Sequence, residues 1–359
     1  MTRPLVRILI TSLTLAATAL SGCGDGGPEA PGPIPRTYRM GFTPIPPRPD
    51  LDDLVATVLL WSERADAGLM SGEAPWDSLL AGVRADSFVI RNQLPLASWL
   101  RSLGLSMLVV NVDPTNGLDR SSDASPLVQA GRSLTEPSIQ QLFRAYATAV
   151  DTLIRPDYMG LASETNLVRA LAPAALYSAV VQTASGCAAD IRAHDVTVPL
   201  FYTVQVETAW GWVSGGGFQG IAQDRADFPF GQTLGLSSYP YFVYADPESL
   251  PSDYYSRLIE AAPIPVMVIE GGWSSETVTS FPSTPALQAR YIRKEMELLD
   301  RIGAVAVFQL TFTDLDLNYW PPAVAPFAYL GLVDVNLAPK PALAEWDAVF
   351  ARPLMFAPR

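Results

Sequence analysis

Short apolar segments alternate with longer segments of helical periodicity along most of this chain, and this alternation limits its fold more than any other feature. Each apolar segment has the length of a strand, and the stretch after it repeats apolar residues every three or four positions. This order predicts βα units and a parallel sheet covered by helices. Eight expected strands lie at residues 38–43, 67–71, 106–112, 158–163, 199–207, 233–238, 266–270 and 304–311.

The segments between these strands have helix-start signals, since several begin at Asp, Ser or Pro. Expected helices include residues 50–64, 138–154, 167–193, 252–262 and 285–302. Eight βα units in about 320 residues predict a single (β/α)8 TIM barrel, which we place at residues 38–359. An open doubly wound sheet would favour a Gly-x-Gly-x-x-Gly loop after an early strand, and the sequence has none. The three glycines at 215–217 are expected to form a flexible loop.

The first residues have the layout of an export signal. Arg3 and Arg7 precede an apolar run at 8–20 that is too short for a settled membrane-spanning helix. Leu20-Ser21-Gly22-Cys23 resembles the lipobox of bacterial lipoproteins, in which the cysteine is lipidated. We therefore expect a lipoprotein signal peptide at residues 1–22. The alternative is an ordinary cleaved signal with a chance cysteine.

Lipid on Cys23 would have consequences for the rest of the chain. Residues 23–37 are rich in Gly and Pro and are expected to tether the domain to the envelope of a bacterium, at the outer membrane or cell surface. Cys187 would then have no disulfide partner and reads as a small buried residue. The membrane contact is expected through this lipid alone, and the protein is expected to be a monomer.

The composition narrows the possible chemistry. The chain has 24 Lys and Arg against 36 Asp and Glu, and this net charge of −12 argues against nucleic acid as a partner. One histidine, His194, and two cysteines cannot build a His-rich or Cys-rich zinc site, and a serine triad is possible only around His194. Carboxylate chemistry remains, for which we expect neither a metal nor another cofactor.

Four expected strands end on or beside an acid, and an acid after so apolar a run is costly to bury unless it is paired or used. These acids are Asp113, Glu164, Glu207 and Glu270. The carboxyl ends of TIM-barrel strands form the active-site face, so the four are candidate site residues. Any single one can equally be an exposed loop acid or a helix cap.

A glutamate at the end of strand four and another at the end of strand seven resemble the retaining clan A glycoside hydrolases. Gly235-Leu236-Ser237-Ser238-Tyr239-Pro240 and Val268-Ile269-Glu270-Gly271-Gly272-Trp273 are similar to strands six and seven of its endo-β-1,4-galactanase family. Gly331-Leu332-Val333-Asp334 with Pro339-Lys340-Pro341-Ala342-Leu343 and Trp346 resembles the closing segment of secreted members. The resemblance covers about residues 38 to 350.

This resemblance implies that Glu164 is the acid/base and Glu270 the nucleophile, with Tyr239 hydrogen-bonded to Glu270. The clan places Asn before the strand-four glutamate, where its amide binds the sugar 2-hydroxyl, whereas this chain has Ser163. Ser163 is expected to make a shorter-reaching bond of that kind. Asn166 is a candidate substitute for the missing amide, although it can instead cap a helix.

Aromatic residues after strand ends are candidates for stacking on a sugar ring. They are Trp76, Trp210, Trp212, Trp273, Tyr319 and Trp320, and we expect Trp273 and Trp320 to line the substrate cleft. Trp61, Trp99 and Trp346 lie in expected helices and are predicted to be core. Glu73, Asp113, Asp314 and Asp316 can add hydroxyl contacts, and the last two can alternatively bind a structural cation.

Together these features predict a lipid-anchored retaining hydrolase that cleaves β-glycosidic bonds in a polysaccharide or oligosaccharide. A second hypothesis is a catalytically inactive TIM-barrel lipoprotein that binds glycans. The distance between the Glu164 and Glu270 carboxyl groups discriminates between them. A third class, a solute-binding lipoprotein of a transporter, would show two α/β lobes joined by a hinge, which eight evenly spaced units disfavour.

Overall fold

A computed structural model describes residues 34–355 of the chain. The expected signal peptide, Cys23 and most of the expected tether lie outside the described residues. The described residues begin before the expected boundary at 38, and among them Arg36 is buried, forms a bridge with Leu354 and makes an ion pair with Asp66. The bridge between Arg36 and Leu354 joins the start of the described chain to its end.

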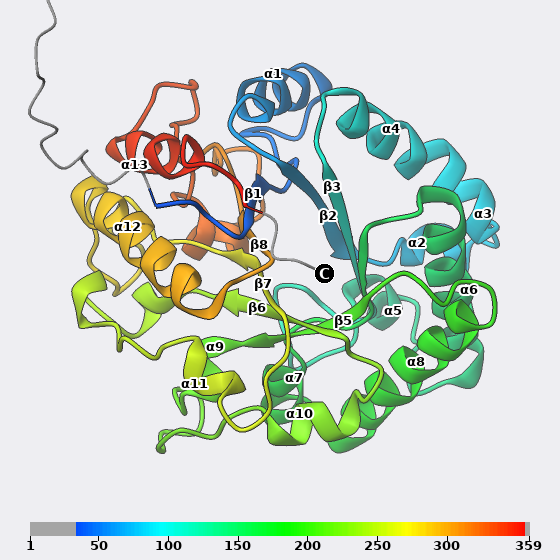
Figure 1. The fold of residues 1–359 in the computed structure, drawn as a ribbon. Helices are drawn as coiled ribbons and strands as arrows, with labels where there is room; N and C mark the ends of the chain where they lie inside the picture. The colour runs from blue at the N-terminus through cyan, green and yellow to red at the C-terminus, as the bar shows by residue number, and fades with distance from the viewer. Residues whose placement is uncertain (1–33, 356–359) are drawn as a thin grey trace, which may run out of the picture. The chain divides into compact units, whose positions relative to one another are not determined.

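Eight parallel strands close into a barrel in the order β1 to β8, which confirms the predicted (β/α)8 fold. Helices surround the strands in the view along the barrel (Figure 1). The strands are β1 (Arg39–Phe42), β2 (Ala67–Glu73), β3 (Met107–Asp113), β4 (Tyr158–Gly160), β5 (Leu200–Gln205), β6 (Thr233–Ser238), β7 (Val266–Gly271) and β8 (Ala306–Gln309). Closure between β1 and β8 pairs Arg39 with Ala306 and Phe42 with Gln309.

The longer helices match the periodic segments of the sequence. They are α1 (Leu51–Ser62), α4 (Leu94–Ser102), α6 (Pro137–Ile154), α8 (Ala174–Arg192), α12 (Pro285–Ile302) and α13 (Pro341–Phe350). Capping explains the ends of α12, because the Thr284 side chain accepts a hydrogen bond from Leu287 N–H and Gly303 adopts the left-handed conformation after the last turn.

Two expected helices differ from the structure. The helix expected at 167–193 is divided into α7 (Thr165–Leu171) and α8, because Pro173 keeps Ala172 extended and starts the second helix. The helix expected at 252–262 is a single turn, α11 (Ser256–Ile259). Other short helices are α2 (Trp76–Leu80), α3 (Ala85–Phe88), α5 (Ser125–Gln129), α9 (Val206–Ala209) and α10 (Ala222–Asp227), with 3₁₀ turns η2 (Pro240–Phe242), η3 (Pro247–Ser249) and η4 (Pro322–Phe327) and a π-helical turn η1 (Val89–Gln93).

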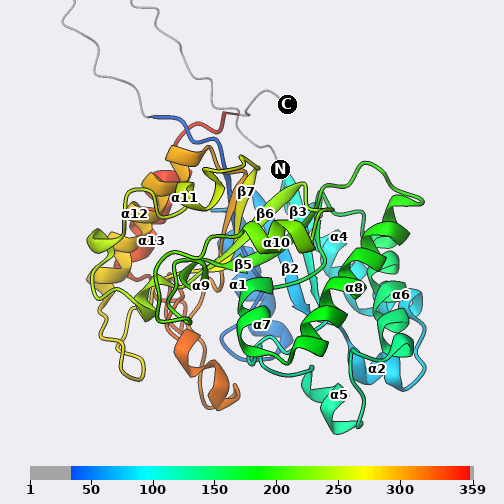
Figure 2. The same ribbon diagram turned by 90° about the horizontal axis from the view of Figure 1, so that it is seen from below.

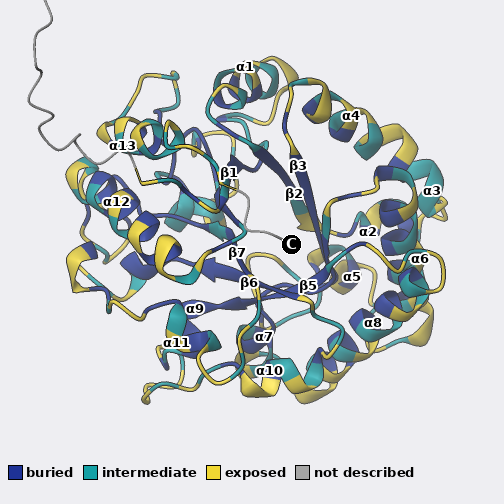
Figure 3. Cartoon of the chain, viewed as in Figure 1, coloured by how far each residue is buried: buried dark blue, intermediate teal, exposed yellow. Residues whose placement is uncertain are grey.

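The core has two layers that follow the alternation of the strands. A small cluster consists of strand residues and includes Leu69, Val109, Met267, Ile269 and Phe308; we assign it to the barrel interior. A larger cluster packs the outer faces of the strands against the helices. In Figure 3 most strand residues are buried, although β2 ends on exposed residues, whereas the longer helices have a buried side and an exposed side.

The carboxyl ends of the strands open at one end of the barrel. Figure 2 shows α5, α7 and the loop after β8 (orange) at this end of the molecule. No helix in residues 34–355 is long and apolar enough to cross a membrane. Cys187 is a free, buried thiol, as the sequence predicts.

Candidate active site

Glu164 is held at the end of β4 in an unusual backbone conformation. Its φ of 45° and ψ of 47° lie in the left-handed region, which is uncommon for a residue with a side chain. The Glu164 N–H donates a 2.7 Å hydrogen bond to Thr203 Oγ1 on β5, and helix α7 begins at the next residue. Such strain is frequent at functional sites, where surrounding contacts fix a side chain in place.

A β-bulge aims Glu270 toward the same place. Leu236 on β6 pairs with Val268 on β7, but the next residue, Ser237, pairs with Glu270. Ile269 already belongs to the interior cluster, so regular alternation would turn Glu270 outward. The bulge removes this conflict and lets two successive residues of β7 face the inside of the barrel and its mouth.

The Ser237 hydroxyl joins the two glutamates. Its Oγ lies 2.5 Å from Glu164 Oε1 and 3.0 Å from Glu270 Oε1, so these two carboxyl oxygens are at most about 5.5 Å apart. A serine hydroxyl has one hydrogen to donate. Both contacts are therefore hydrogen bonds only when one of the two carboxyl groups is protonated and donates to Ser237.

Arg120 supplies positive charge to this cluster. Its Nε donates to Glu164 Oε2 at 2.8 Å, and its Nη1 donates to Asp113 Oδ2 at 2.5 Å. Both ion pairs are almost fully buried. With Glu270 the cluster has three carboxyl groups and one guanidinium, an imbalance that favours retaining a proton on one acid.

The electrostatic environment points to Glu270 as the acid that holds this proton. Its deep position in the mouth, and then the charge of Glu164, raise the pKa of the Glu270 carboxyl to about 7. Arg120 and the Ser237 hydrogen bond act in the opposite direction. At neutral pH, close to this pKa, Glu270 is therefore protonated in about half of the molecules, which is the state that the shared hydroxyl requires.

A cavity of about 370 Å³ opens above this cluster. Of the predicted site residues, it brings together Glu164, Glu270, Tyr239 and Trp320. Asp113 and Ser163 support the cavity from behind: Asp113 holds Arg120, and Ser163 accepts a 3.0 Å hydrogen bond from the Asn111 amide. The Trp320 indole N–H donates to Pro47 O, which fixes this ring at the mouth.

Tyr239 reaches the cavity but does not make its predicted hydrogen bond to Glu270. Its ring packs against Tyr241, Phe242 and Phe327, and Ser237 takes the position beside Glu270. The bond implied by the resemblance is thus replaced by one from Ser237, which lies two residues earlier, on β6.

Three predicted site residues lie elsewhere, and those predictions are wrong. Trp273 is fully buried, packs on Tyr291 and donates to Ser283 Oγ. Glu207 is buried outside the cavity. Asn166 neither faces the cavity nor caps a helix: its amide donates to Gln205 O and accepts from Gln205 N, so it ties α7 to β5.

The remaining aromatic candidates also separate by burial. Trp76 is buried against Phe143, and Trp210 packs between Phe218 and Tyr254. Trp212 and Tyr319 are exposed, outside the lining of the cavity. Trp61 and Trp346 are fully buried and Trp99 packs partly buried against the core, as predicted.

The other candidate acids are satisfied by protein groups. Glu73 accepts from Gly117 N, Asp314 pairs with Lys340, and Asp316 pairs with Arg48. The described residues contain no group of three His, Cys, Asp or Glu side chains placed to hold a metal ion. His194 lies at the connection before β5, where it contacts Asp151 rather than the mouth.

Sequence reasoning missed Arg120 and the role of Ser237. Ser237 lies in the predicted strand six, in a segment that the resemblance already identified. Its position could therefore be predicted from the sequence, although its contacts with the two glutamates could not. Arg120 lies in the loop after β3 and has no local signal. Its approach to Glu164 depends on the path of that loop.

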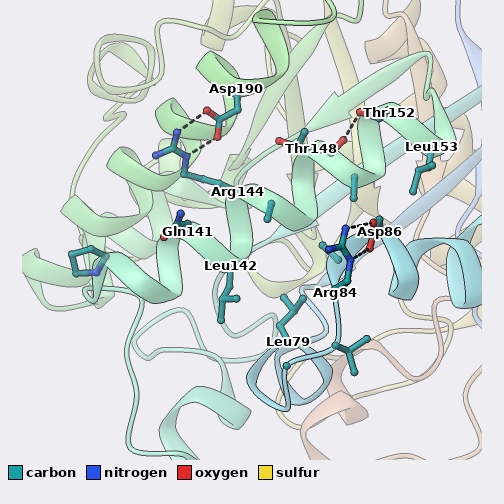
Figure 4. A pocket seen from close by; sticks show the side chains of 16 residues that line it. Leu79, Arg84, Asp86, Gln141, Leu142, Arg144, Thr148, Thr152, Leu153 and Asp190 are labelled. Carbon is teal, nitrogen blue, oxygen red and sulfur yellow. Dashed lines mark hydrogen bonds and ion pairs between the residues drawn. The ribbon is translucent and has the colours of Figure 1, made fainter.

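A larger groove of about 1010 Å³ lies on the outside of the barrel, against α6 (Figure 4). Its acids are neutralised by arginines: Asp86 pairs with Arg84, and Asp190 pairs with Arg144. None of the predicted site residues lines it. The mouth cavity is therefore the candidate active site despite its smaller volume.

Comparisons with known proteins bear on the fold. No protein-family model matches the chain, and a search of curated proteins gives no match. Exo-β-1,4-mannosidase Op5Man5 from Opitutaceae bacterium strain TAV5 is similar in structure over 88% of this chain and 59% of its own, with a TM-score of 0.67 and 16% identity. This chain thus spans less than two thirds of that protein.

Two further solved structures have the same barrel. Xylanase 10B from Thermotoga maritima matches 88% of this chain and 95% of its own, with a TM-score of 0.59 and 13% identity. A β-glucuronidase from Ruminococcus gnavus matches 89% of this chain and 50% of its own, with a TM-score of 0.57 and 12% identity. At such identities the similarity establishes the shared fold.

Proposed function

We propose that this protein is a retaining glycoside hydrolase that cleaves a β-glycosidic bond at the barrel mouth. One observation carries the proposal: the Ser237 hydroxyl contacts both Glu164 and Glu270, so these two carboxyl oxygens lie at most about 5.5 Å apart. Retaining glycosidases need two carboxyl groups about 5 to 5.5 Å apart, one protonated and one ionised. The names of the structurally similar proteins agree with this chemistry.

In the proposed reaction Glu164 protonates the departing oxygen while Glu270 attacks the anomeric carbon and forms a glycosyl-enzyme. Glu164 then removes a proton from water, which hydrolyses the intermediate. In the molecules in which Glu270 holds the proton, that proton must first move. Ser237 provides the route: it accepts the proton of Glu270 and donates its own to Glu164. Arg120 keeps Asp113 as a partner while Glu164 is neutral.

The two glutamates should fail differently when removed. Glu270→Ala should abolish hydrolysis, and azide should restore turnover with inverted stereochemistry. Glu164→Ala should impair alkyl glycosides far more than activated aryl glycosides, whose leaving group departs without a proton. The assay is a panel of β-glycosides and β-glycans with the 24–359 fragment. Wild-type rates in Glu270→Ala would exclude the mechanism.

A glycan-binding protein without activity is the second candidate. Ser163 favours it, because this residue stands where the related hydrolases have Asn and its hydroxyl is already engaged by Asn111. Under this alternative the panel shows binding but no hydrolysis, and Glu270→Ala leaves binding unchanged.

We also propose that the protein is secreted and anchored to a bacterial membrane by lipid on Cys23. The sequence motif at 20–23 supports this location. Cys23→Ser should release the protein from the membrane fraction without unfolding the barrel. Continued recovery in that fraction, with unchanged need for detergent, would contradict the proposal.

A further inference from the structure

The walls of the mouth cavity differ in chemistry from its floor. The charged side chains Arg120, Glu164 and Glu270 lie at the floor, where the strands end. Around them the lining is mainly hydrocarbon and aromatic. The apolar lining residues are Ile45, Leu118, Leu167, Leu171, Tyr239, Leu310, Leu315, Trp320, Val324 and Phe327.

Few polar groups remain for binding sugar hydroxyls beyond one ring. Thr311 lines the cavity, is fully buried, and its hydroxyl has no hydrogen-bond partner in the protein. Gln205 also lines it: its Oε1 already accepts from Thr208, which leaves the Nε2 amide as a donor. Asp119 is occupied by the Ser121 and Ser122 hydroxyls. A second sugar would therefore meet mostly hydrocarbon and lose hydrogen bonds to water without replacement.

The apolar wall is continuous with the side that holds the proposed acid. Leu167 and Leu171 are one turn apart on α7, which begins directly after Glu164, so they share a helix face. Leu118 joins this wall from the loop that also holds Arg120. Leu118 is 51% exposed and Leu171 is 47% exposed, although both line the cavity. Exposed apolar side chains grouped at a cavity rim are typical of a binding surface.

The volume sets a further limit. About 370 Å³ is near the lower end of the range for small-molecule sites, about 300 to 1,000 Å³. It suits one sugar ring and a compact group bonded to it. It does not suit an extended polysaccharide segment.

We infer that the substrate is a β-glycoside whose leaving group is a hydrocarbon, an alkyl or aryl aglycone, rather than another sugar. The sugar ring lies over the polar floor, and the aglycone lies against Leu118, Leu167 and Leu171 beside Glu164. This inference rests on the proposed function, because the assignment of Glu164 as the acid decides on which side of the sugar the leaving group lies. The preference of the cavity for an apolar substituent can be measured independently of any reaction.

The first test measures binding by calorimetry with the Glu270→Gln protein, in which attack on the sugar is blocked. The probes are methyl, hexyl and phenyl β-glycosides and the β-1,4-linked disaccharide of each sugar in a panel of glucose, mannose, galactose, xylose and glucuronic acid. For the sugar that binds best, we expect the hexyl or phenyl glycoside to bind at least about tenfold more tightly than the methyl glycoside and the disaccharide. Comparing hexyl with phenyl separates a lipid-like from an aromatic aglycone.

The second test changes the wall in the same Glu270→Gln background. Adding Leu171→Asn or Leu118→Asn should reduce the hexyl-to-methyl affinity ratio at least about threefold. Leu59→Asn is the matched control, because Leu59 is 46% exposed on α1, outside the cavity lining. Circular dichroism of each variant verifies that the barrel is folded.

The outcomes separate the inference from the proposed function. Equal affinities for hexyl, phenyl and methyl glycosides, no detectable binding of any, or tighter binding of the disaccharide would overturn the inference. An unchanged ratio in both leucine variants would overturn it too. If the preference holds but the wild-type protein hydrolyses no glycoside, the apolar aglycone site stands and the hydrolase proposal fails.

Discussion

Buried carboxyl groups occur in two regions of this barrel, and they are satisfied in different ways. At the mouth, Glu164 and Glu270 share one hydroxyl and border a cavity. On the outer side of β6 lies a second group, the tyrosine cluster of Glu207, Glu295, Tyr254, Tyr255 and Tyr291. Here Glu207 accepts from Tyr254 Oη at 2.7 Å and Tyr239 N at 2.8 Å, and Glu295 accepts from Tyr291 Oη at 3.0 Å.

The two acids of the tyrosine cluster accept hydrogen bonds from neutral groups, and neither acid lines the mouth cavity. Loss of contact with water raises the pKa of both Glu207 and Glu295 to about 7. The same cause is the largest one for Glu270, whose pKa is also raised to about 7. A raised pKa therefore does not distinguish a structural acid from a reactive one here. The distinguishing features are a hydroxyl shared by two acids and a cavity that both acids line.

The largest expected difference between the two regions is in activity. Glu164→Gln removes the proposed proton donor and should lower kcat/KM on an alkyl glycoside about 10²- to 10⁴-fold. Glu207→Gln, at the end of the neighbouring strand, should stay within about fivefold of wild type because Glu207 lies outside the cavity. Equal losses in the two variants, measured under the same conditions, would show that the tyrosine cluster takes part in catalysis.

The second difference is in stability. Arg120→Met leaves Asp113 and Glu164 buried without a cation, and should lower the free energy of unfolding by about 3 to 5 kcal/mol. Arg144→Met is the matched control, since it breaks an exposed ion pair with Asp190 and should cost no more than about 1 kcal/mol. Urea unfolding of both variants measures this. A small effect in Arg120→Met would mean that water already reaches the charges at the mouth.

The third prediction concerns pH and tests the tyrosine cluster alone. The folded-state pKa of Glu295 is about 7 against an ordinary 4.5, so its contribution to stability is fully present below about pH 4.5 and is lost as the pH rises toward 7. Glu295→Gln should remove this slope and gain about 1 to 3 kcal/mol relative to wild type between pH 4.5 and 8. Chemical unfolding across that range measures it. A shifted pH profile of activity in this variant would instead link the two regions.

The smallest expected effect is that of Ser237→Ala. Loss of the shared hydrogen bond should lower kcat/KM about tenfold. Because that bond lowers the pKa of Glu270, its removal should raise this pKa further and move the acidic limb of the kcat/KM profile to higher pH. Ser238→Ala, one residue along on the outer face, is the control and should leave the limb in place. An unmoved limb in Ser237→Ala would mean that the hydroxyl does not couple the acids.

Much of the fold was readable from the sequence because each strand and long helix has its own local pattern. The candidate pair was also readable, since strand ends in a barrel meet at one face. Glu207 shows why the rule is incomplete: it also follows a strand, but the chain turns into α9 there and carries the side chain outward. Trp273 fails similarly, because Gly272, with a φ of 141°, redirects the chain after β7. Such turns depend on neighbouring strands and have no local signature.

Arg120 and Ser237 illustrate what tertiary structure adds. Neither residue type is unusual, and each contacts a glutamate of the pair that lies more than 30 positions away in the sequence. Pro173, in contrast, is a local signal for a helix boundary. The helical periodicity on both sides of it nevertheless led to the prediction of one continuous helix.

The bulge between β6 and β7 has a consequence for transplanting or evolving such a site. Ile269 packs the barrel interior and Glu270 borders the mouth, although they are adjacent on one strand. Grafting the amino-acid sequence of β7 alone onto another barrel would therefore not reproduce the register shift between β6 and β7. Without this shift the glutamate side chain would turn toward the helices. The site depends on one strand having one more residue than its neighbour between two paired positions. A one-residue insertion or deletion can therefore create or remove this arrangement, whereas a substitution leaves the residue count unchanged.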